Sequence, residues 1–411
     1  MTTLLFIVGI VILFFGMISF VVPDIDLIRG PAFFISWLVT ELAPQIVVID
    51  TVILTVLVML GGYKNLFGIL GVILIVINIF ILAYHIRNSL RAAAILERTL
   101  AENITVLESE SVEQVFRANC KKVVTGRIFP FPIKPRAIQK TKNISYCDDE
   151  LKRHKLDIYA EKISITESND SQSSKLKPVV LVVHGGAWII GQKENQGLPH
   201  IHTLAKNGYV CVTINYRLSP KATWPDHIVD VKAALVWIKQ NVENFGGDKD
   251  RIALLGMSAG GHLVSLAALS FNDPEYQPGF EDADTSFKAC VPIYPVLDLT
   301  NSLKVQTRQL ISMVSKYVFK SSLRQDRTRW ESASPLLRDM SQGPDMFILH
   351  GNKDLLVPIE ESIEFVEKYR SSGNVICFAN LTGAQHAFEI FWSIRSRKSV
   401  AAVMTFLDFM L

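Results

Sequence analysis

A serine flanked by glycines is the clearest sign of chemistry in this 411-residue sequence. Ser258 lies in Gly-Met-Ser-Ala-Gly at 256–260, after an apolar run at 252–255 and before an Ala-rich stretch. A strand followed by a helix would hold this serine on a sharp turn, where glycine, which lacks a Cβ, lets the backbone close. Small residues also mark purely structural turns, but this context favours Ser258 as a nucleophile.

A serine hydroxyl is a poor nucleophile at neutral pH, so it requires a general base. His262 lies one helical turn after Ser258 and would have to fold back to reach it. His350 ends an apolar run, where a structural histidine is the simpler interpretation. His386 lies in a predicted loop between the last strand and the last helix, where this architecture carries its base. We therefore predict that His386 is the base.

The base in turn requires a carboxylate that orients it. Asp354 follows a predicted strand and precedes the start of a helix at Val357 and Pro358, which is the matching position for this acid. Asp298 is the competing candidate, but it falls one strand earlier than the usual position. The prediction is a triad of Ser258, Asp354 and His386, with Asp298 as the alternative acid.

A second motif, His-Gly-Gly-Ala-Trp at 184–188, follows another apolar run. When a serine attacks an acyl carbon, negative charge develops on the carbonyl oxygen, and each fixed N–H donor aimed there is worth ~3 kcal/mol. Gly186 and Ala187 are positioned to donate from one side, and Ala259 from the other. Trp188 is either a wall of the acyl pocket or a core residue.

Short β-branched runs alternate with helical patterns from residue 141 onward. The predicted strands are 143–147, 154–159, 179–183, 209–214, 252–255, 289–293, 346–349 and 375–379. The predicted helices are 195–206, 227–244, 260–269, 359–370 and 391–411. This alternation predicts an α/β fold, a mostly parallel sheet with helices on both faces.

The first 86 residues are far more apolar than the rest and predict about three transmembrane helices, at 3–22, 45–60 and 66–86. The first run is long enough for a hydrocarbon core of ~30 Å, and it lacks the basic start and cleavage site of a signal peptide. Residues 30–42 are too short to span and suggest an interfacial helix. We expect Asp50 at a helix end in the headgroup zone, with an intramembrane functional site as the alternative.

The sequence divides into a membrane domain at 1–86, a helical and proline-rich connector at 87–140, and a catalytic domain at 141–411. Segment 298–335 follows a strand and includes an amphipathic stretch. We expect it to form a cap over Ser258 that helps to select the substrate, although a helix packed on the core would have the same pattern.

Composition excludes several classes of protein. Charged residues make up 20% and apolar residues 49%, which excludes a disordered chain, a collagen-like chain and a coiled coil. The net charge of +3 is too small to indicate nucleic acid. Five scattered cysteines without a C-x-x-C pair favour neither a disulfide framework nor a metal site, and we expect no cofactor.

Charge placement predicts that the catalytic domain faces the cytosol. With three spans, the connection at 23–44 shares a side with everything after residue 86, and cytosolic loops are enriched in Lys and Arg. Near the ends of the spans, that side carries four cations, Arg29, Arg87, Arg91 and Arg98, whereas the other side carries Lys64. Four N-x-S/T sequons would instead suit a secretory lumen, at Asn103, Asn143, Asn169 and Asn380.

Four motifs together resemble the hormone-sensitive-lipase-like carboxylesterases of the α/β-hydrolase superfamily. They are His-Gly-Gly-Ala-Trp at 184–188, Asn-Tyr-Arg-Leu-Ser-Pro at 215–220, Phe-Gly-Gly-Asp-Lys-Asp-Arg-Ile at 245–252 and Gly-Met-Ser-Ala-Gly-Gly at 256–261. The resemblance covers residues 140–411. It implies the α/β-hydrolase fold, the triad and the oxyanion hole described above.

Two departures from that family are visible. Ala187 stands where the family usually has a third glycine, and the acid lies in a run at 354–358 that is closer to feruloyl-esterase-like relatives. The stretch 185–191, joined to apolar segments, also resembles prenylcysteine methylesterases, which act on membrane-attached substrates.

These observations favour a membrane-anchored serine carboxylesterase that cleaves an apolar or lipid-like ester through an acyl-Ser258 intermediate. An amidase or deacetylase would use the same triad, and a prenylcysteine methylesterase is a further alternative. A non-catalytic receptor or scaffold could lose a triad residue, yet Ser258, Asp354 and His386 are all present.

Overall fold

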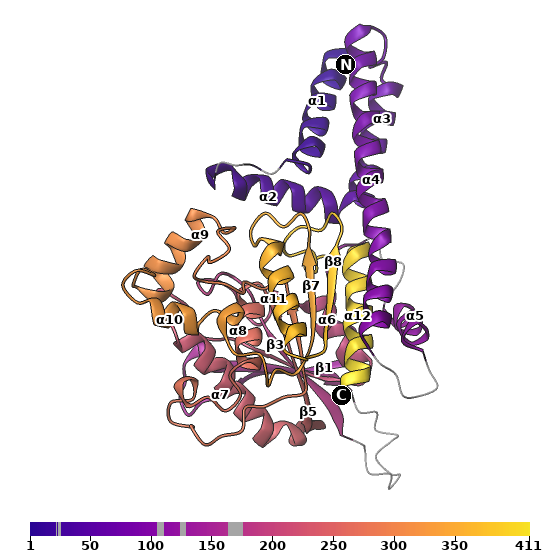
Figure 1. The fold of residues 1–411 in the computed structure, drawn as a ribbon. Helices are drawn as coiled ribbons and strands as arrows, with labels where there is room; N and C mark the ends of the chain where they lie inside the picture. Colours follow the sequence, from indigo (N-terminus) through magenta and orange to yellow (C-terminus); the bar gives the residue numbers. More distant parts are fainter. Residues whose placement is uncertain (22, 24–25, 105–110, 124–128, 163–175) are drawn as a thin grey trace, which may run out of the picture.

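A mostly parallel sheet forms the centre of the molecule (Figure 1). The computed structural model describes the chain except for residues 22, 24–25, 105–110, 124–128 and 163–175. The sequon at Asn169 and parts of the connector therefore lie outside the described residues.

All eight strands expected from the sequence are present, in the order β1-β2-β4-β3-β5-β6-β7-β8. They are β1 (Ile138–Ser145), β2 (Lys155–Glu161), β3 (Lys177–Val183), β4 (Val210–Ile214), β5 (Gly247–Met257), β6 (Ala289–Ile293), β7 (Asp345–Gly351) and β8 (Ile376–Leu381). Strands β3 to β8 run parallel, whereas β2 is antiparallel to both of its neighbours. The α/β class is thereby confirmed.

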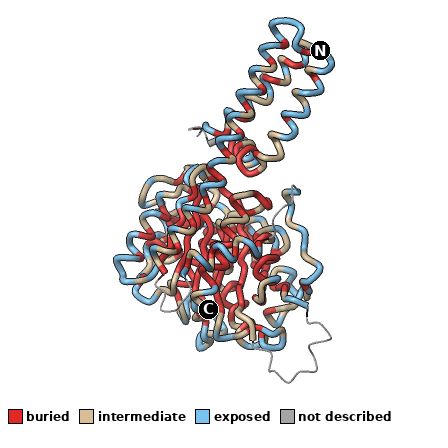
Figure 2. The backbone as a smooth tube through the Cα atoms, turned by 90° about the vertical axis from the view of Figure 1, so that its right-hand side faces the viewer, coloured by how far each residue is buried: buried red, intermediate tan, exposed pale blue. Residues whose placement is uncertain are grey.

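Helices cover both faces of the sheet, as expected. One face packs against α7 (Asp226–Asn241), α8 (Ala259–Ala268) and α11 (Ile359–Ser371). The other packs against α5 (Val112–Lys122), α6 (Leu198–Lys206), α12 (Ile394–Met410) and the second half of α4 (Leu66–Asn103). Buried apolar side chains fill both layers (Figure 2).

The segment after β6 is helical, as the expected cap would be. It contains α9 (Arg308–Met313), a π-helical turn (Val314–Phe319) and α10 (Arg327–Ser332). Val314, Val318 and Phe319 are buried in the core, so this part packs on the domain. Leu310 and Met313 are only partly buried and lie beside the cavity described below.

The N-terminal helices project from one end of the domain (Figure 1). Helices α1 (Thr2–Ile18), α3 (Ala43–Met59) and α4 lie side by side, whereas α2 (Asp26–Glu41) crosses between them and the sheet domain (Figure 1). The surface of this bundle exposes large apolar side chains, such as Met59, Leu66 and Phe80 at 82%, 68% and 71%. A contiguous apolar surface of this kind is typical of contact with a membrane.

Among the described residues, α4 is the one helix that is long and apolar enough to cross a membrane alone. Residues 28–59 pass the same test only as a pair of helices bent by 84°, and α1 has 17 residues. Helix α4 continues without a break past residue 86 into the connector, whose first part was predicted to be helical. The three separate spans and the domain limits stay predictions.

The expected position of Asp50 at a helix end was wrong. This residue lies in the middle of α3, not at its end, and only 3% of it is exposed. Its Oδ2 accepts a hydrogen bond of 2.8 Å from Asn78 Nδ2 on α4. A buried polar group is costly unless it has a partner, and Asn78 supplies one from the neighbouring helix.

Candidate active site

Ser258 occupies the sharp turn between β5 and α8 that the sequence predicts. Its φ is +55°, a strained value for a residue with a side chain, and its N–H donates to the Ile293 carbonyl at 3.0 Å. A Cβ at Gly260 would lie 2.2 Å from the Val183 carbonyl oxygen, so only glycine allows α8 to start this close to β3. The turn therefore presents the serine at the carboxyl ends of the parallel strands.

His386 and Asp354 form a hydrogen-bonded pair next to this turn. The Nδ1 atom of His386 lies 2.7 Å from Oδ2 of Asp354, and both side chains are at least nine-tenths buried. His386 comes from the loop between β8 and α12, and Asp354 follows β7. The sequence-predicted base and acid are thus brought together by neighbouring strands.

Asp354 is fixed in the ionised form. Its Oδ1 accepts the N–H groups of Leu356 and Val357, both at 2.8 Å, which leaves Oδ2 for His386. Burial alone would raise the pKa of this carboxyl, but the charge of His386 and hydrogen bonds from His350 and His386 hold it below its ordinary value. An ionised Asp354 accepts the Nδ1 proton of His386 and leaves Nε2 free as a base.

The two competing residues have other contacts. Asp298 accepts hydrogen bonds from the backbone and hydroxyl groups of Thr300 and Ser302, and it does not bond to His386. His350 contacts the Ser362 hydroxyl and the Val357 carbonyl, and its Nε2 lies 3.4 Å from Oδ2 of Asp354, so this histidine supports the acid.

His262 is also structural in its contacts. It lies 2.8 Å from the Ala333 carbonyl and accepts a hydrogen bond from the Trp188 indole at 3.2 Å. Burial lowers the pKa of His262 to about 4, so the ring is neutral at neutral pH.

The predicted oxyanion-hole residues surround Ser258. Gly186 has a φ of +116°, and a Cβ there would lie 2.1 Å from the Ile190 carbonyl oxygen, so the turn requires glycine. Ala187 follows at a φ of +52°. Ala259 is the first residue of α8, where N–H groups have no partner within the helix.

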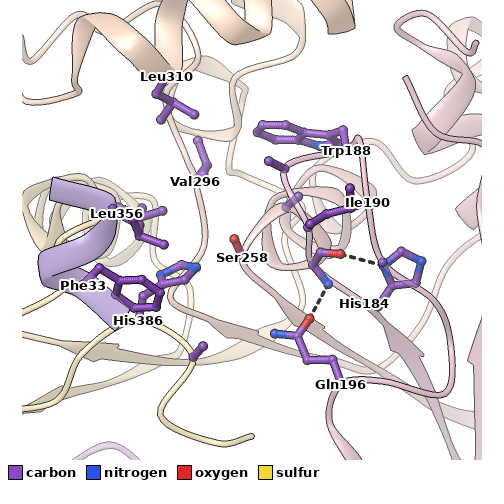
Figure 3. A pocket seen from close by; sticks show the side chains of 18 of the residues that line it. Phe33, His184, Trp188, Ile190, Gln196, Ser258, Val296, Leu310, Leu356 and His386 are labelled. Carbon is purple, nitrogen blue, oxygen red and sulfur yellow. Dashed lines mark hydrogen bonds between the residues drawn. The ribbon is translucent and has the colours of Figure 1, made fainter. Parts of the chain in front are cut away.

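A cavity of about 550 Å³ opens above Ser258 (Figure 3). Ser258, His386, Gly186, Ala187 and Ala259 all line it. The rest of its wall is mostly apolar and comes from Trp188, Ile190, Val296, Leu310, Met313, Leu355 and Leu356. Trp188 is 1% exposed and packs in the core as well, so both interpretations of this residue apply.

The Ser258 hydroxyl and the His386 ring face the same cavity (Figure 3). Within the described part of the chain, no hydrogen bond joins these two side chains; catalytic hydrogen bonds of this kind commonly tighten when a substrate binds. The cavity is therefore lined by the serine and by the histidine, and the histidine is held from behind by Asp354.

A buried polar network behind the site escaped the sequence analysis. The Gln196 side chain accepts the Gly185 N–H at 2.7 Å and donates to Tyr294 and Glu389 at 3.2 and 3.1 Å. Tyr294 in turn donates to Glu389, and its ring centroid lies 4.3 Å from that of His386. The network connects the oxyanion-hole turn with the histidine loop, and no motif spacing identifies it.

Helix α2 also borders the site, which its sequence did not indicate. Arg29, Gly30 and Phe33 line the cavity beside His386. The indole of Trp37 donates to the Ala387 carbonyl at 3.0 Å, directly after the predicted base. The sequence of residues 30–42 suggests an interfacial helix but not its contact with the histidine loop.

A family model described as BD-FAE matches residues 157–369, a range that contains Ser258 and Asp354. The chain is 41% identical over 249 residues to the probable carboxylic ester hydrolase LipM of Mycobacterium tuberculosis (strain ATCC 25618 / H37Rv). It is 30% identical over 232 residues to the probable isoprenylcysteine alpha-carbonyl methylesterase ICMEL1 of Oryza sativa subsp. japonica.

These alignments are partial. The first covers 60% of this chain and 58% of LipM, and the second covers 54% and 52%. The chain therefore spans less than two thirds of these curated relatives.

Two solved structures share the fold. A truncated carbohydrate esterase from gut microbiota has a TM-score of 0.55 at 23% identity, over 66% of this chain and 96% of that one. A thermophilic esterase of Thermogutta terrifontis with butyrate bound has a TM-score of 0.52 at 22% identity, over 66% and 92%. The fold is therefore the α/β-hydrolase fold that the sequence predicts.

Proposed function

The chain belongs to the BD-FAE family, and from this we propose that it is a membrane-anchored serine carboxylesterase that cleaves an apolar or lipid-like ester. The observation that carries the proposal is the arrangement of Ser258 and the His386–Asp354 pair around one mostly apolar cavity. Curated relatives named as ester hydrolases support the reaction class.

In the proposed reaction, Ser258 Oγ attacks the acyl carbon while Nε2 of His386 takes the hydroxyl proton. Asp354 holds the ring through Nδ1 and stabilises the imidazolium that forms. The N–H groups of Gly186, Ala187 and Ala259 stabilise the negative charge on the carbonyl oxygen, and each such hydrogen bond lowers the barrier by ~3 kcal/mol.

The second half of the reaction releases the products. The imidazolium of His386 gives its proton to the leaving alcohol, and the acyl group stays on Ser258 as an ester. Water then attacks this ester while His386 takes a proton from it, which releases the carboxylic acid and restores the serine. These steps require no metal or organic cofactor.

The direct test is Ser258→Ala in the full-length protein. We expect loss of p-nitrophenyl butyrate turnover and of fluorophosphonate labelling, with an unchanged melting temperature. Ser341→Ala, an exposed serine that does not line the cavity, is the control. Stoichiometric labelling of the Ser258 variant would contradict the assignment.

Prenylcysteine methyl ester cleavage is the second candidate, because a curated relative carries that name and the site adjoins apolar helices. Turnover of S-farnesylcysteine methyl ester should then exceed turnover of the same ester without the farnesyl chain. Equal rates would favour a general carboxylesterase, and faster cleavage of a matched amide would favour an amidase or deacetylase.

We also propose that the apolar N-terminal region passes the membrane several times and that the catalytic domain faces the cytosol. The contact of α2 with the histidine loop supports the inference that residues 23–44 and the catalytic domain share a side. Protease added to intact cells should leave the catalytic domain uncut. Digestion from outside, or glycosylation at any of the four sequons, would overturn this placement.

A further inference from the structure

Helix α2 contributes a wall of the active-site cavity, although it lies far outside the matched family region. Gly30 and Phe33 line the cavity together with Ser258. The Phe33 ring centroid lies 6.3 Å from that of His386, at an interplanar angle of 70° (Figure 3). A substrate that reaches Ser258 along this wall would contact α2 before it meets the catalytic residues.

This wall is fixed to the catalytic domain, not laid loosely over it. The Gln385 amide donates to the Ser36 hydroxyl at 2.8 Å, next to the Trp37–Ala387 bond. The Trp37 ring also stacks on Phe391 at 4.6 Å. Contacts at residues directly beside His386 therefore fix the position of α2 relative to the site.

Gly30 leaves space along the wall. A Cβ at this position would meet no atom within 4 Å, so a larger side chain would extend into open volume. The same cavity is also lined by Leu310 and Met313 of α9 and by Leu356. An extended apolar chain fits such a mostly apolar space because burying its methylenes is favourable.

The outer face of α2 adjoins the apolar bundle. Phe34 and Leu38 are 59% and 40% exposed, on the helix that joins the exposed apolar helices α1 and α3. One side of α2 thus contacts the cavity while another continues the apolar surface of the bundle. A chain that leaves a lipid layer would meet this helix first.

We propose that α2 is the binding wall for a long linear apolar chain of the substrate, acyl or prenyl, which enters from the membrane side, and that Gly30 sets how much of the chain fits. This inference rests on the proposed esterase function and specifies its substrate class.

Chain-length selectivity tests the proposal in full-length protein in nanodiscs. The ratio of kcat/KM for p-nitrophenyl decanoate to that for the acetate is measured in each variant. Each methylene of the acyl chain that is buried in the cavity should raise kcat/KM about fourfold. Gly30→Trp should therefore lower the ratio at least tenfold, and Gly30→Ala should lower it less.

Ile28→Trp is the matched control. It adds the same side chain to the same helix at a residue that is 49% exposed and does not line the cavity. The ratio should stay within twofold of the wild-type value. Equal ratios for Gly30→Trp, Ile28→Trp and the wild type would overturn the proposal.

Photocrosslinking provides a readout that needs no turnover. A decanoyl ester with a terminal diazirine, added to Ser258→Ala, should label the peptide that contains residues 29–33. Labelling confined to other peptides would overturn the role of α2, even if the wild type hydrolyses esters. Absence of wild-type turnover and of fluorophosphonate labelling would instead reject the esterase function, whereas the crosslink would still report chain binding.

Discussion

A buried ion pair joins the end of α2 to the start of α12, and breaking it should loosen α2 from the histidine loop. The Glu41 carboxylate accepts from Arg395 and, at 2.7 Å, from the Ser393 hydroxyl. Arg395 also donates to the Thr382 carbonyl at 3.3 Å. Neither charged side chain is exposed, so Arg395→Met would leave the Glu41 carboxylate buried without its counter-charge.

The expected cost follows from that burial. Removing one partner of a buried pair costs about 3–5 kcal/mol, whereas replacing both partners by apolar residues is often neutral. In a domain of this size, each kcal/mol of lost stability lowers the melting temperature by about 2 °C. Arg395→Met should therefore lower the melting temperature by roughly 6–10 °C. Adding Glu41→Met to this variant should restore most of the loss.

The assay is thermal unfolding of the detergent-solubilised protein. Arg98→Met is the control, because Arg98 and Glu102 form an ion pair of 2.7 Å on α4 whose side chains are 79% and 56% exposed. A solvent-exposed pair of this kind contributes little to stability, because water screens its charges. The reasoning is refuted if Arg395→Met and Arg98→Met shift the melting temperature equally, or if the double variant is no more stable than Arg395→Met.

Two further predictions concern the site, and a third concerns Glu361, a buried residue of α11. Asp354→Asn should lower kcat by roughly 10³–10⁴-fold with a smaller change in KM. Asp298→Asn should leave kcat within a few-fold of the wild-type value. Steady-state kinetics of both variants are the measurement, and the reverse pattern would make Asp298 the acid. Gln196→Ala should lower kcat about tenfold at nearly constant KM, because the Gly185 N–H loses its acceptor. A change in KM alone would instead indicate that Gln196 acts in substrate binding. Burial raises the pKa of Glu361 to about 7, so the folded state binds this proton more tightly than the unfolded state. Stability should therefore fall by about 3 kcal/mol as the pH rises from about 4.5 to 7, and urea titrations at several pH values should show a smaller slope for Glu361→Gln.

Local patterns predicted the fold because the forces that form each element act over a few residues. The strand predicted at 289–293 coincides with β6, the one predicted at 179–183 begins two residues after the start of β3, and the helix predicted at 359–370 differs from α11 by one residue. The expectation for Asp50 failed for the opposite reason. Its environment depends on Asn78, a residue of another helix that no local window contains.

At the site, too, local patterns predicted some residues, whereas contacts between distant segments could not be predicted. Ser258, Asp354 and His386 could be selected because each lies directly after a predicted strand or in a defined loop. The contact between Trp37 and Ala387 joins residues 350 positions apart, and the carboxylate of Glu389 meets Tyr294 across 95 positions. Only the packed structure brings such groups together.

The limits of the predicted domains and the limits of the active site do not coincide. The family region at 157–369 contains Ser258 and Asp354 but neither His386 nor α2. Helix α2 belongs to the predicted membrane domain, yet it bonds to both neighbours of His386, Gln385 and Ala387. The loop that carries the base is therefore held between the catalytic sheet and an element that packs against the apolar bundle. In this arrangement the N-terminal region helps to build the site, so the same contacts set the position of His386 and the shape of the cavity wall that α2 forms.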